Sequence, residues 1–215
     1  NLGVLRQQRG QYAEAAREYR EALRLDPTAV EALNNLGLLY LDQDQPGEAR
    51  MQLQRALQLR PEYQEARVNL ELLELRAQGT PPVSSYAQLV QRYPQQASLW
   101  LALGRARAAE GDWQGAAVAG EEARRLSPGL AGAPVLLAGV YHQLGRLPEA
   151  IEACRQAIAL SPGEAALYNN LAAALAAAGR RGEALQATRR ALELDPGNVR
   201  AAQNLQQLSQ APRPR

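Results

Sequence analysis

LAGVYHQLGRLPEAIEACRQAIALSP, residues 137–162, is one copy of a pattern that recurs along the whole chain. Its last residue has counterparts at intervals of 33 or 34 residues. These prolines are Pro27, Pro61, Pro94, Pro128, Pro162 and Pro196. Self-similarity at such a period is the signature of a stacked array, because one small unit cannot bury its apolar face alone. The sequence therefore predicts one supersecondary unit repeated six times.

Other positions recur in register with the prolines. An alanine stands five residues before each proline except the third, and a glycine stands seventeen residues before it in four units. The alanines are Ala22, Ala56, Ala123, Ala157 and Ala191, and the glycines are Gly10, Gly111, Gly145 and Gly179. The spacing of Leu53, Ala56 and Leu57 follows the period of an α-helix. The glycine predicts a left-handed cap after the first helix of each unit, and the proline ends the second helix.

This pattern resembles the tetratricopeptide repeat, a 34-residue helix–turn–helix unit. The resemblance covers residues 1–196 and implies an all-α, right-handed superhelical solenoid of antiparallel helix pairs. Repeats are expected to end near residues 29, 63, 96, 130, 164 and 198, within a single array over 1–210. Residues 199–210 should form a polar capping helix, which brings the total to about thirteen helices and no strand. Residues 211–215 should be a disordered tail.

Two local patterns carry expectations of their own. In the third unit Gly79-Thr80-Pro81-Pro82 interrupts the repeat and the spacing shortens by one residue. We expect a longer connection there and a shorter second helix, with the two prolines in its first turn, where no amide partner is needed. Thr28, followed three residues later by Glu31, predicts a capping box at the start of the next helix.

The beginning of the chain lies within a repeat. Asn1 falls at the sixth slot of the pattern and no initiator methionine is present, so we expect a piece of a longer protein. The incomplete first unit could dock on another copy of the chain. No run of 18 apolar residues and no signal-peptide pattern occurs. A cytoplasmic location is therefore favoured, with an anchor or signal upstream of residue 1 left open.

Composition and charge exclude several classes of function. The net charge is only +2, and charges of both signs are mixed along the helices, so a nucleic-acid interface, which needs a concentrated basic patch, is not expected. All 24 basic residues are arginine, a bias that indicates a GC-rich bacterial genome. The single histidine, His142, excludes a metal site built on two histidines. We expect no catalytic residue, no metal and no cofactor.

The lone cysteine is predicted to be a core residue. Cys154 cannot form an intrachain disulfide, and it occupies a slot held by Tyr19 and Leu53 in the first two units. A pairing with His142 as base and nucleophile is disfavoured, because the two residues lie on opposite helices and Cys154 should face the core.

The resemblance places binding in an inner groove lined by the first helix of each unit. One inward slot is asparagine in five of seven units. It reads Asn1, Asn35, Asn69, Ala102, Leu136, Asn170 and Asn204. A carboxamide both donates and accepts hydrogen bonds, so such a ladder can hold a peptide backbone. It is similar to the peptide-binding arm of O-linked N-acetylglucosamine transferases. The alternative is that these amides bond within the array.

Leucines beside this ladder predict an apolar strip in the groove, which often marks a binding site. The alternative is that they pack between first helices. Basic residues are nearly absent from the inward slots, so a basic clamp for a C-terminal carboxylate is disfavoured. The candidate peptide-binding residues are Asn35, Leu38, Leu41, Asn69, Leu72, Leu75, Arg105 and Asn170.

These observations predict a non-catalytic protein–protein interaction scaffold within a multiprotein assembly. Its partner is expected to be a protein or peptide, bound as an extended segment or an amphipathic helix in the concave groove. No nucleic acid and no small-molecule cofactor is expected. The alternative is the substrate-recruiting arm of a larger enzyme, such as a glycosyltransferase. Self-association through the incomplete first repeat is a third possibility.

Overall fold

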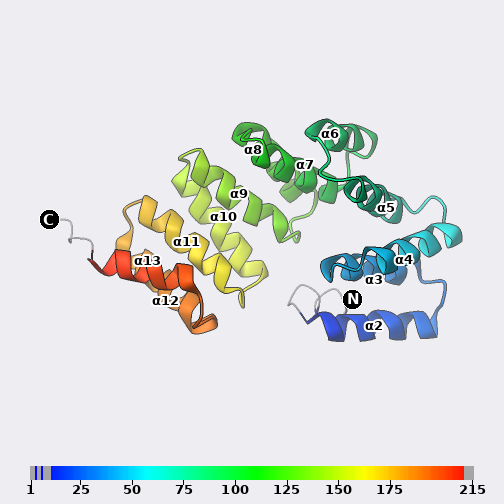
Figure 1. The fold of residues 1–215 in the computed structure, drawn as a ribbon, viewed down its shortest axis with the longest axis horizontal. Helices are drawn as coiled ribbons and strands as arrows, with labels where there is room; N and C mark the ends of the chain where they lie inside the picture. Colours follow the sequence, from blue (N-terminus) through cyan, green and yellow to red (C-terminus); the bar gives the residue numbers. More distant parts are fainter. Residues whose placement is uncertain (1–2, 4–5, 7–10, 211–215) are drawn as a thin grey trace. The chain divides into compact units, whose positions relative to one another are not determined.

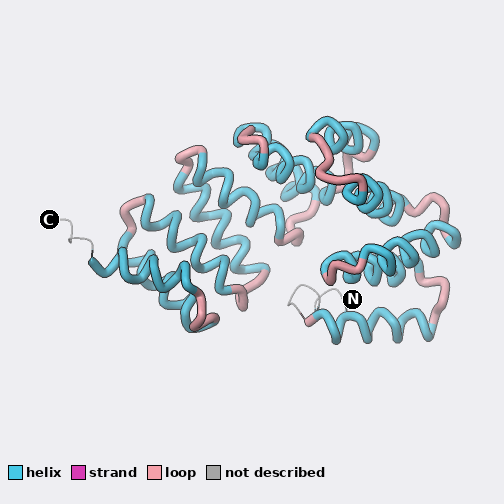
Figure 2. Tube along the Cα trace, in the orientation of Figure 1, coloured by secondary structure: helices cyan, strands magenta, loops and turns pink. Residues whose placement is uncertain are grey.

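The computed structural model describes Gly3, Arg6 and residues 11–210. This part of the chain contains twelve helices and no strand (Figures 1 and 2). They are α2 (Tyr12–Leu25), α3 (Val30–Asp42), α4 (Pro46–Leu59), α5 (Gln64–Ala77), α6 (Val83–Arg92), α7 (Ala97–Ala109), α8 (Trp113–Leu126), α9 (Gly132–Gln143), α10 (Leu147–Leu160), α11 (Ala165–Ala177), α12 (Arg181–Leu194) and α13 (Val199–Gln210). The all-α fold is confirmed. The expected first helix, the incomplete end proposed to self-associate and the tail lie largely or wholly outside the described residues.

Helical hairpins are the building block of the fold. The chain divides into two compact units, residues 1–85 and 86–215. In the first unit α2 to α5 pack in chain order, and in the second α7 to α13 do so. The first helices of neighbouring repeats also pack on one another, as α3 does on α5 and α9 on both α7 and α11. The second helices, in contrast, pack mainly on first helices and not on one another. Because the first helices of neighbouring repeats lie closer together than the second helices do, the first-helix side is the inner side of each unit.

A pair of facing slots sets the distance between the two helices of a repeat. A Cβ atom added at Gly37 on α3 would lie 3.0 Å from Cγ of Leu53 on α4. A Cβ at Gly3 would likewise lie 2.6 Å from Cε1 of Tyr19. Glycine in the first slot therefore leaves room for a large side chain in the second. Where the first slot holds alanine, the second holds a smaller residue: the pairs are Ala138 with Cys154 and Ala172 with Thr188.

The fourth repeat fills the same space differently. Both slots are glycine there, Gly104 and Gly120, and leucines from the following helix α9 occupy the volume. A Cβ at Gly104 would lie 2.6 Å from Cδ2 of Leu136, and one at Gly120 would lie 2.8 Å from Cδ2 of Leu137. Close packing of the interior is thus preserved although the contributing residues change.

Residues in the left-handed backbone conformation follow the first helices, as the glycine pattern predicts. Gly111, Gly145 and Gly179 have φ angles of 81°, 71° and 73°. Gly10 lies outside the described residues. The second repeat has no glycine at this slot, and Asp44 adopts the same conformation with φ of 56°. An L-residue with a Cβ is disfavoured in this region, so Asp44 is a local weak point.

We expect Asp44→Gly to raise the free energy of unfolding by about 0.5–1 kcal/mol. Relief of the left-handed strain outweighs the larger entropy of glycine in the unfolded chain. Urea unfolding followed by circular dichroism measures the change. The reverse change, Gly145→Ala, is the control and should destabilise, because a Cβ there meets no atom within 4 Å and only the backbone conformation is affected. An unchanged or less stable Asp44→Gly variant would contradict the interpretation.

The third repeat has the longer connection and shorter second helix expected from its sequence. Helix α6 has 10 residues, whereas α4 and α8 have 14 each. Gly79 in the connection has φ of 116°. The expected position of the prolines is wrong by a residue or two: α6 begins at Val83, and the Pro82 carbonyl accepts a hydrogen bond from the Ser85 amide at 3.0 Å. Both prolines therefore precede the first turn.

The predicted capping box at Thr28 is also wrong. Helix α3 begins at Val30, and its N-cap residue, Ala29, has no side-chain capping bond. The Thr28 amide and hydroxyl instead donate to Oδ1 of Asp26, at 2.9 and 2.7 Å. A carboxylate two residues upstream competes for the same donors, as short polar side chains do in turns. Glu31 pairs with Arg60 at 2.8 Å.

Candidate protein-binding site

The eight candidate residues lie on first helices, but they belong to two different compact units. Helix α3 carries Asn35, Leu38 and Leu41, and α5 carries Asn69, Leu72 and Leu75. These six lie in the first unit, whereas Arg105 on α7 and Asn170 on α11 lie in the second. The contact between α3 and α5 brings the first six onto one surface.

Burial separates the candidates into two groups. Asn69 and Leu72 are each only 8% exposed, so they present little surface to a partner. Asn35, Leu38, Leu41 and Leu75 are half-buried, and Arg105 and Asn170 are exposed. Leu41 also packs against the core cluster that includes Leu33 and Leu53. Leu38, Leu41 and Leu75 thus each keep some exposed apolar surface.

Two of the asparagines bridge neighbouring first helices. Asn69 Nδ2 on α5 donates to Asn34 Oδ1 on α3 at 2.8 Å. Asn204 Nδ2 on α13 makes the equivalent bond to Asn169 Oδ1 on α11, also at 2.8 Å. Both acceptors are buried, at 5% and 4% exposure. The side-chain amides of Asn69 and Asn204 are therefore bonded within the array.

At the other two contacts between neighbouring first helices of the second unit, the two positions that hold this asparagine pair carry different residues. Between α7 and α9 the pair is apolar, because Leu101 and Leu136 pack in one hydrophobic cluster. Between α9 and α11 it is mixed, with Val135 in the slot that holds Asn34 and Asn169 elsewhere. A valine side chain accepts no hydrogen bond, so Asn170 has no amide partner among the described residues and its carboxamide is exposed.

A hollow of about 320 Å³ lies on the first-helix side of the second unit. Its lining residues come from α9, α10, α11 and α13 and include the candidate Asn170. They are Val135, Ala138, Gly139, His142, Gln143, Cys154, Asn170, Ala173, Ala174 and Arg200. We call this the first-helix hollow. Its buried lining residues are Ala138, Cys154 and Ala174, and its polar side chains, His142, Gln143, Asn170 and Arg200, are exposed.

Cys154 borders this hollow but is a core residue, as its slot predicts. It is 2% exposed, and burial raises the pKa of its thiol to about 11. Because the thiolate is the nucleophilic form, the protonated thiol at neutral pH is unreactive. His142 is exposed on α9. The two residues therefore do not form an activated nucleophile and base.

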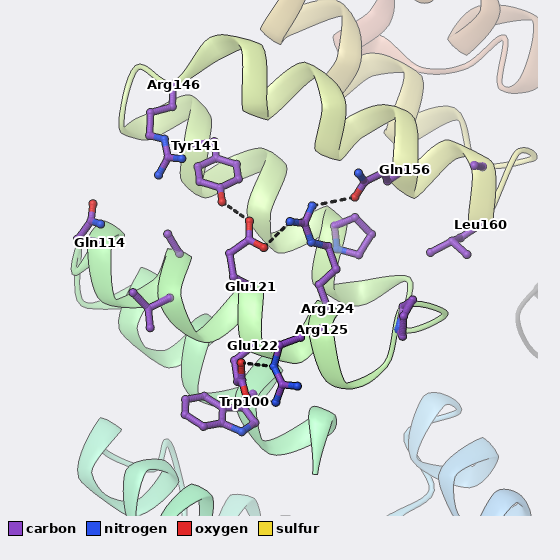
Figure 3. Close-up of a pocket in the computed structure, with 15 residues that line it drawn as sticks. Trp100, Gln114, Glu121, Glu122, Arg124, Arg125, Tyr141, Arg146, Gln156 and Leu160 are labelled. Carbon is purple, nitrogen blue, oxygen red and sulfur yellow. Dashed lines mark hydrogen bonds and ion pairs between the residues drawn. The ribbon is translucent and has the colours of Figure 1, made fainter. Parts of the chain in front are cut away.

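A second hollow, of about 1210 Å³, lies between the second helices α8 and α10, and we call it the second-helix hollow (Figure 3). Helix α9 contributes Pro134 and Tyr141 to it. Exposed apolar surface at its rim comes from Val118 on α8 and Leu160 on α10, which are 56% and 37% exposed. Sequence reasoning missed this surface because the resemblance directs attention to the first helices. The signal that could have found it is a valine on the outer face of a second helix.

The charged groups of the second-helix hollow are already paired. The Tyr141 hydroxyl donates to Glu121, Glu121 pairs with Arg124, and Arg124 Nη1 donates to Gln156 at 3.0 Å (Figure 3). The Arg146 guanidinium lies 4.4 Å from the centre of the Tyr141 ring. Burial, and then the bond to Glu121, raises the pKa of Tyr141 to about 12. This network ties α8, α9 and α10 together and leaves its carboxylates and guanidiniums occupied.

The described residues hold neither a metal centre nor a membrane-crossing helix. Residues 11–210, with Gly3 and Arg6, contain no group of three or more histidine, cysteine, aspartate or glutamate side chains placed to hold a metal ion. Over the same residues, none of the helices has the length and apolar character required to cross a membrane.

Four models of repeat families match the sequence. One described as TPR repeat matches residues 5–44, and three described as tetratricopeptide repeat match residues 30–60, 83–131 and 130–197. Together they cover most of the chain. No curated protein sequence gives a significant match.

Solved structures agree on the fold. A chain of the APC/C hetero-tetramer Cut9–Hcn1 is similar with a TM-score of 0.72 at 17% identity, over 96% of this chain and 41% of that one. The present chain thus spans about two fifths of that relative's length. TTC0263, a thermophilic TPR protein of Thermus thermophilus, has a TM-score of 0.57 at 24% identity, over 85% of this chain and 100% of its own.

A third similar structure is the first TPR of Spaghetti (RPAP3) bound to the HSP90 peptide SRMEEVD. Its TM-score is 0.52 at 27% identity, over 54% of this chain and 92% of that chain. The recurring helical hairpins, the left-handed residues between their helices and these matches lead to one assignment. The chain belongs to the tetratricopeptide repeat family.

Proposed function

We propose that the chain is a scaffold that holds a peptide or an amphipathic helix of another protein against the first-helix side of its repeats. The observation that carries the proposal is the face of α3 formed by Asn35, Leu38 and Leu41. These residues are spaced three apart and so share one side of the helix, and all three are half-buried. A partly exposed apolar strip beside an amide suits a segment that brings both apolar side chains and backbone groups.

The similarity to a peptide-bound relative supports the same mode of action. The Spaghetti (RPAP3) domain was solved with a peptide of HSP90, and it aligns with about half of this chain at 27% identity. Family membership favours a non-catalytic role, because function in such arrays rests on extended inner surfaces. Among the proposed contacts, Leu38, Leu41 and Leu75 supply apolar surface and Asn35 supplies an amide. Asn69 and Leu72 are buried and support these residues by packing.

Leu38→Glu should weaken binding of a peptide roughly tenfold or more, because burying one leucine contributes about 1.5–3 kcal/mol and a buried carboxylate adds a desolvation cost. The ligands for this test are peptides selected from a random display library on the immobilised wild-type chain. Affinity is measured by fluorescence anisotropy and the melting temperature by circular dichroism, on the same samples.

Leu59→Glu is the matched control, since Leu59 is 44% exposed and lies on the second helix α4. It should leave affinity unchanged. Equal effects of both variants would argue against a first-helix site. A melting temperature that falls by many degrees for Leu38→Glu, with unchanged affinity per folded molecule, would make Leu38 a core residue instead.

A further inference from the structure

We propose that the second-helix hollow is a second docking site, and that its occupant is an amphipathic α-helix of a partner protein whose apolar stripe carries no charge. The site lies between α8 and α10, and α9 contributes Pro134 and Tyr141 to its lining (Figure 3). It is separate from the first-helix face of α3, so the inference goes beyond the proposed function. A chain with both sites holds two partner segments.

The hollow has the size and the walls of a groove for a chain segment. Helices α8 and α10 each pack on α9 rather than on one another, which leaves a channel between them. Its volume of about 1210 Å³ exceeds the roughly 300–1,000 Å³ of sites for small molecules. A helix laid along this channel packs its side chains between those of both walls, as neighbouring helices do in bundles.

Val118 on α8 supplies apolar surface that the fold itself does not use, since it is 56% exposed. Its slot lies ten residues before the proline of each repeat and is polar in four of the other five repeats. The residues there are Arg17, Met51, Ser84, Glu152 and Gln186. A β-branched residue is a poorer helix former than arginine, glutamate or glutamine. Neither packing nor helix propensity favours valine at this position, which leaves contact with a partner as its role.

The rest of the lining has the composition of a protein interface. Ala159 and Leu160 on α10 are exposed and add apolar surface to the opposite wall. Trp100 and Tyr141 line the hollow together with three arginines, Arg124, Arg125 and Arg146. Tryptophan, tyrosine and arginine are the residues most enriched where protein partners bury one another. The lining therefore favours a protein as occupant.

The polar part of the lining is ordered before a partner arrives. Four residues before the proline, the other five repeats carry an apolar residue, whereas the fourth repeat carries Arg124. The apolar residues are Leu23, Leu57, Val90, Ile158 and Leu192. Arg124 pairs with Glu121 on its own helix and donates to Gln156 Oε1 on α10 at 3.0 Å. A partner that packs on this guanidinium does not have to order it first, which lowers the entropic cost of binding.

The bonding of the polar groups decides which kind of segment fits. In addition to that network, the Trp100 indole donates to the Pro94 carbonyl at 2.8 Å. Arg125 and Arg146 pair with glutamates three residues away. Gln114 is the one polar lining side chain that has no partner among the described residues. An extended segment needs donors and acceptors for its backbone, whereas a helix bonds its own. The hollow offers too few such groups for an extended segment and favours a helix.

Charge selects the residues on the inner face of that helix. The carboxylates and guanidiniums that line the hollow already have counter-ions. A charged side chain brought by the partner would lose its water and find no uncommitted opposite charge. The stripe that enters the hollow is therefore apolar, with residues at the spacing i, i+3 or i+4, and i+7. Charged residues belong on the outer face of the bound helix.

The test uses pairs of positions that share a repeat slot. A display library of helix-forming peptides, about five helical turns long, is selected on the immobilised wild-type chain. Affinities of individual peptides are measured by fluorescence anisotropy for Val118→Glu and Leu160→Glu, with Met51→Glu and Leu59→Glu as matched controls. Met51 and Leu59 hold the same two slots on α4, are 57% and 44% exposed, and do not line the hollow.

One class of selected peptides should bind Val118→Glu and Leu160→Glu about tenfold or more weakly than wild type, because a carboxylate replaces apolar surface that the peptide buries. The same peptides should bind both controls as they bind wild type. Their circular dichroism should become more helical on binding, and a proline at the peptide centre should abolish binding. Glutamate on the apolar stripe should also abolish it, whereas glutamate on the outer face should be tolerated.

The outcomes separate this site from the first-helix site. If no selected peptide responds to Val118→Glu or Leu160→Glu, or if the two controls have equal effects, the second docking site is overturned. Peptides that respond to Val118→Glu but not to Leu38→Glu support it, even if none responds to Leu38→Glu and the proposed function fails. Tolerance of the central proline would overturn the helical occupant. If wild type sediments as a dimer and Val118→Glu as a monomer, the occupant is a second copy of the chain and the partner helix is overturned. If no peptide is selected above an uncoated support, both proposals fail.

Discussion

Leu53→Ala should lower the free energy of unfolding by about 2–5 kcal/mol, the range for removing a buried leucine side chain from a packed core. Leu53 on α4 is 0% exposed and faces Gly37 on α3. Urea unfolding by circular dichroism measures the loss, and hydrogen exchange should place it in α3 and α4, because each repeat contacts mainly its neighbours. Leu59→Ala, on the exposed side of the same helix, is the control and should lose far less.

The facing-slot arrangement makes a sharper prediction about Gly37→Ala. In the wild type the new methyl group would lie 3.0 Å from Leu53 Cγ and 3.3 Å from the Ala49 carbonyl oxygen, so we expect destabilisation despite the better helix propensity of alanine. In the Leu53→Ala background the first contact is gone and the methyl group fills part of the cavity. The same change should then stabilise. If Gly37→Ala has the same sign in both backgrounds, the two slots do not set the helix spacing.

Asn69→Ala should cost about 1–3 kcal/mol, because it leaves the buried Asn34 Oδ1 without its donor. Asn35→Ala is the matched control, since Asn35 is half-buried and its contact to Asn34 is long, at 3.5 Å. It should cost well under half as much. Thermal and urea unfolding of both variants measure the difference.

Replacing both partners tests whether the loss comes from the unsatisfied acceptor. The double variant Asn34→Val with Asn69→Ala copies the residues found at these slots one repeat later, Val68 and Ala102. Because no buried polar atom is then left unpaired, stability should return to near the wild-type value. A double variant as unstable as Asn69→Ala would mean that the carboxamides contribute by packing and not by their hydrogen bond.

Most of the fold could be predicted from the sequence because a repeat is local. The helix boundaries follow from apolar periodicity and from the residues that end helices, and both act within one turn of the chain. The left-handed conformation at Gly111, Gly145 and Gly179 is such a case. Even the irregular third repeat is visible in the sequence as Gly79-Thr80-Pro81-Pro82. Errors occurred where two side chains could accept from one donor, as Asp26 and Glu31 could from the Thr28 amide, which bonds to Asp26.

The candidate site could be predicted less well, because exposure in an array depends on the residue that the next repeat places opposite. Asn69 and Asn170 occupy the same slot and are equivalent in sequence, yet one is bonded to Asn34 and the other faces Val135. Which amide is free is thus a property of pairs about 35 residues apart. Sequence periodicity reports the average environment of a slot and not its particular neighbour.

By itself the sequence determined the class of the fold, the number of repeats and the side of each helix that packs against neighbouring helices, since helical periodicity and turn residues act at short range. Only the tertiary structure decided which groups remain available for binding. It brought Arg200 of α13 and Asn170 of α11 to the lining of one hollow, and it formed a second hollow between α8 and α10 whose charged groups are already paired. These arrangements arise from side chains on three or four different helices, and their meeting depends on how successive hairpins pack.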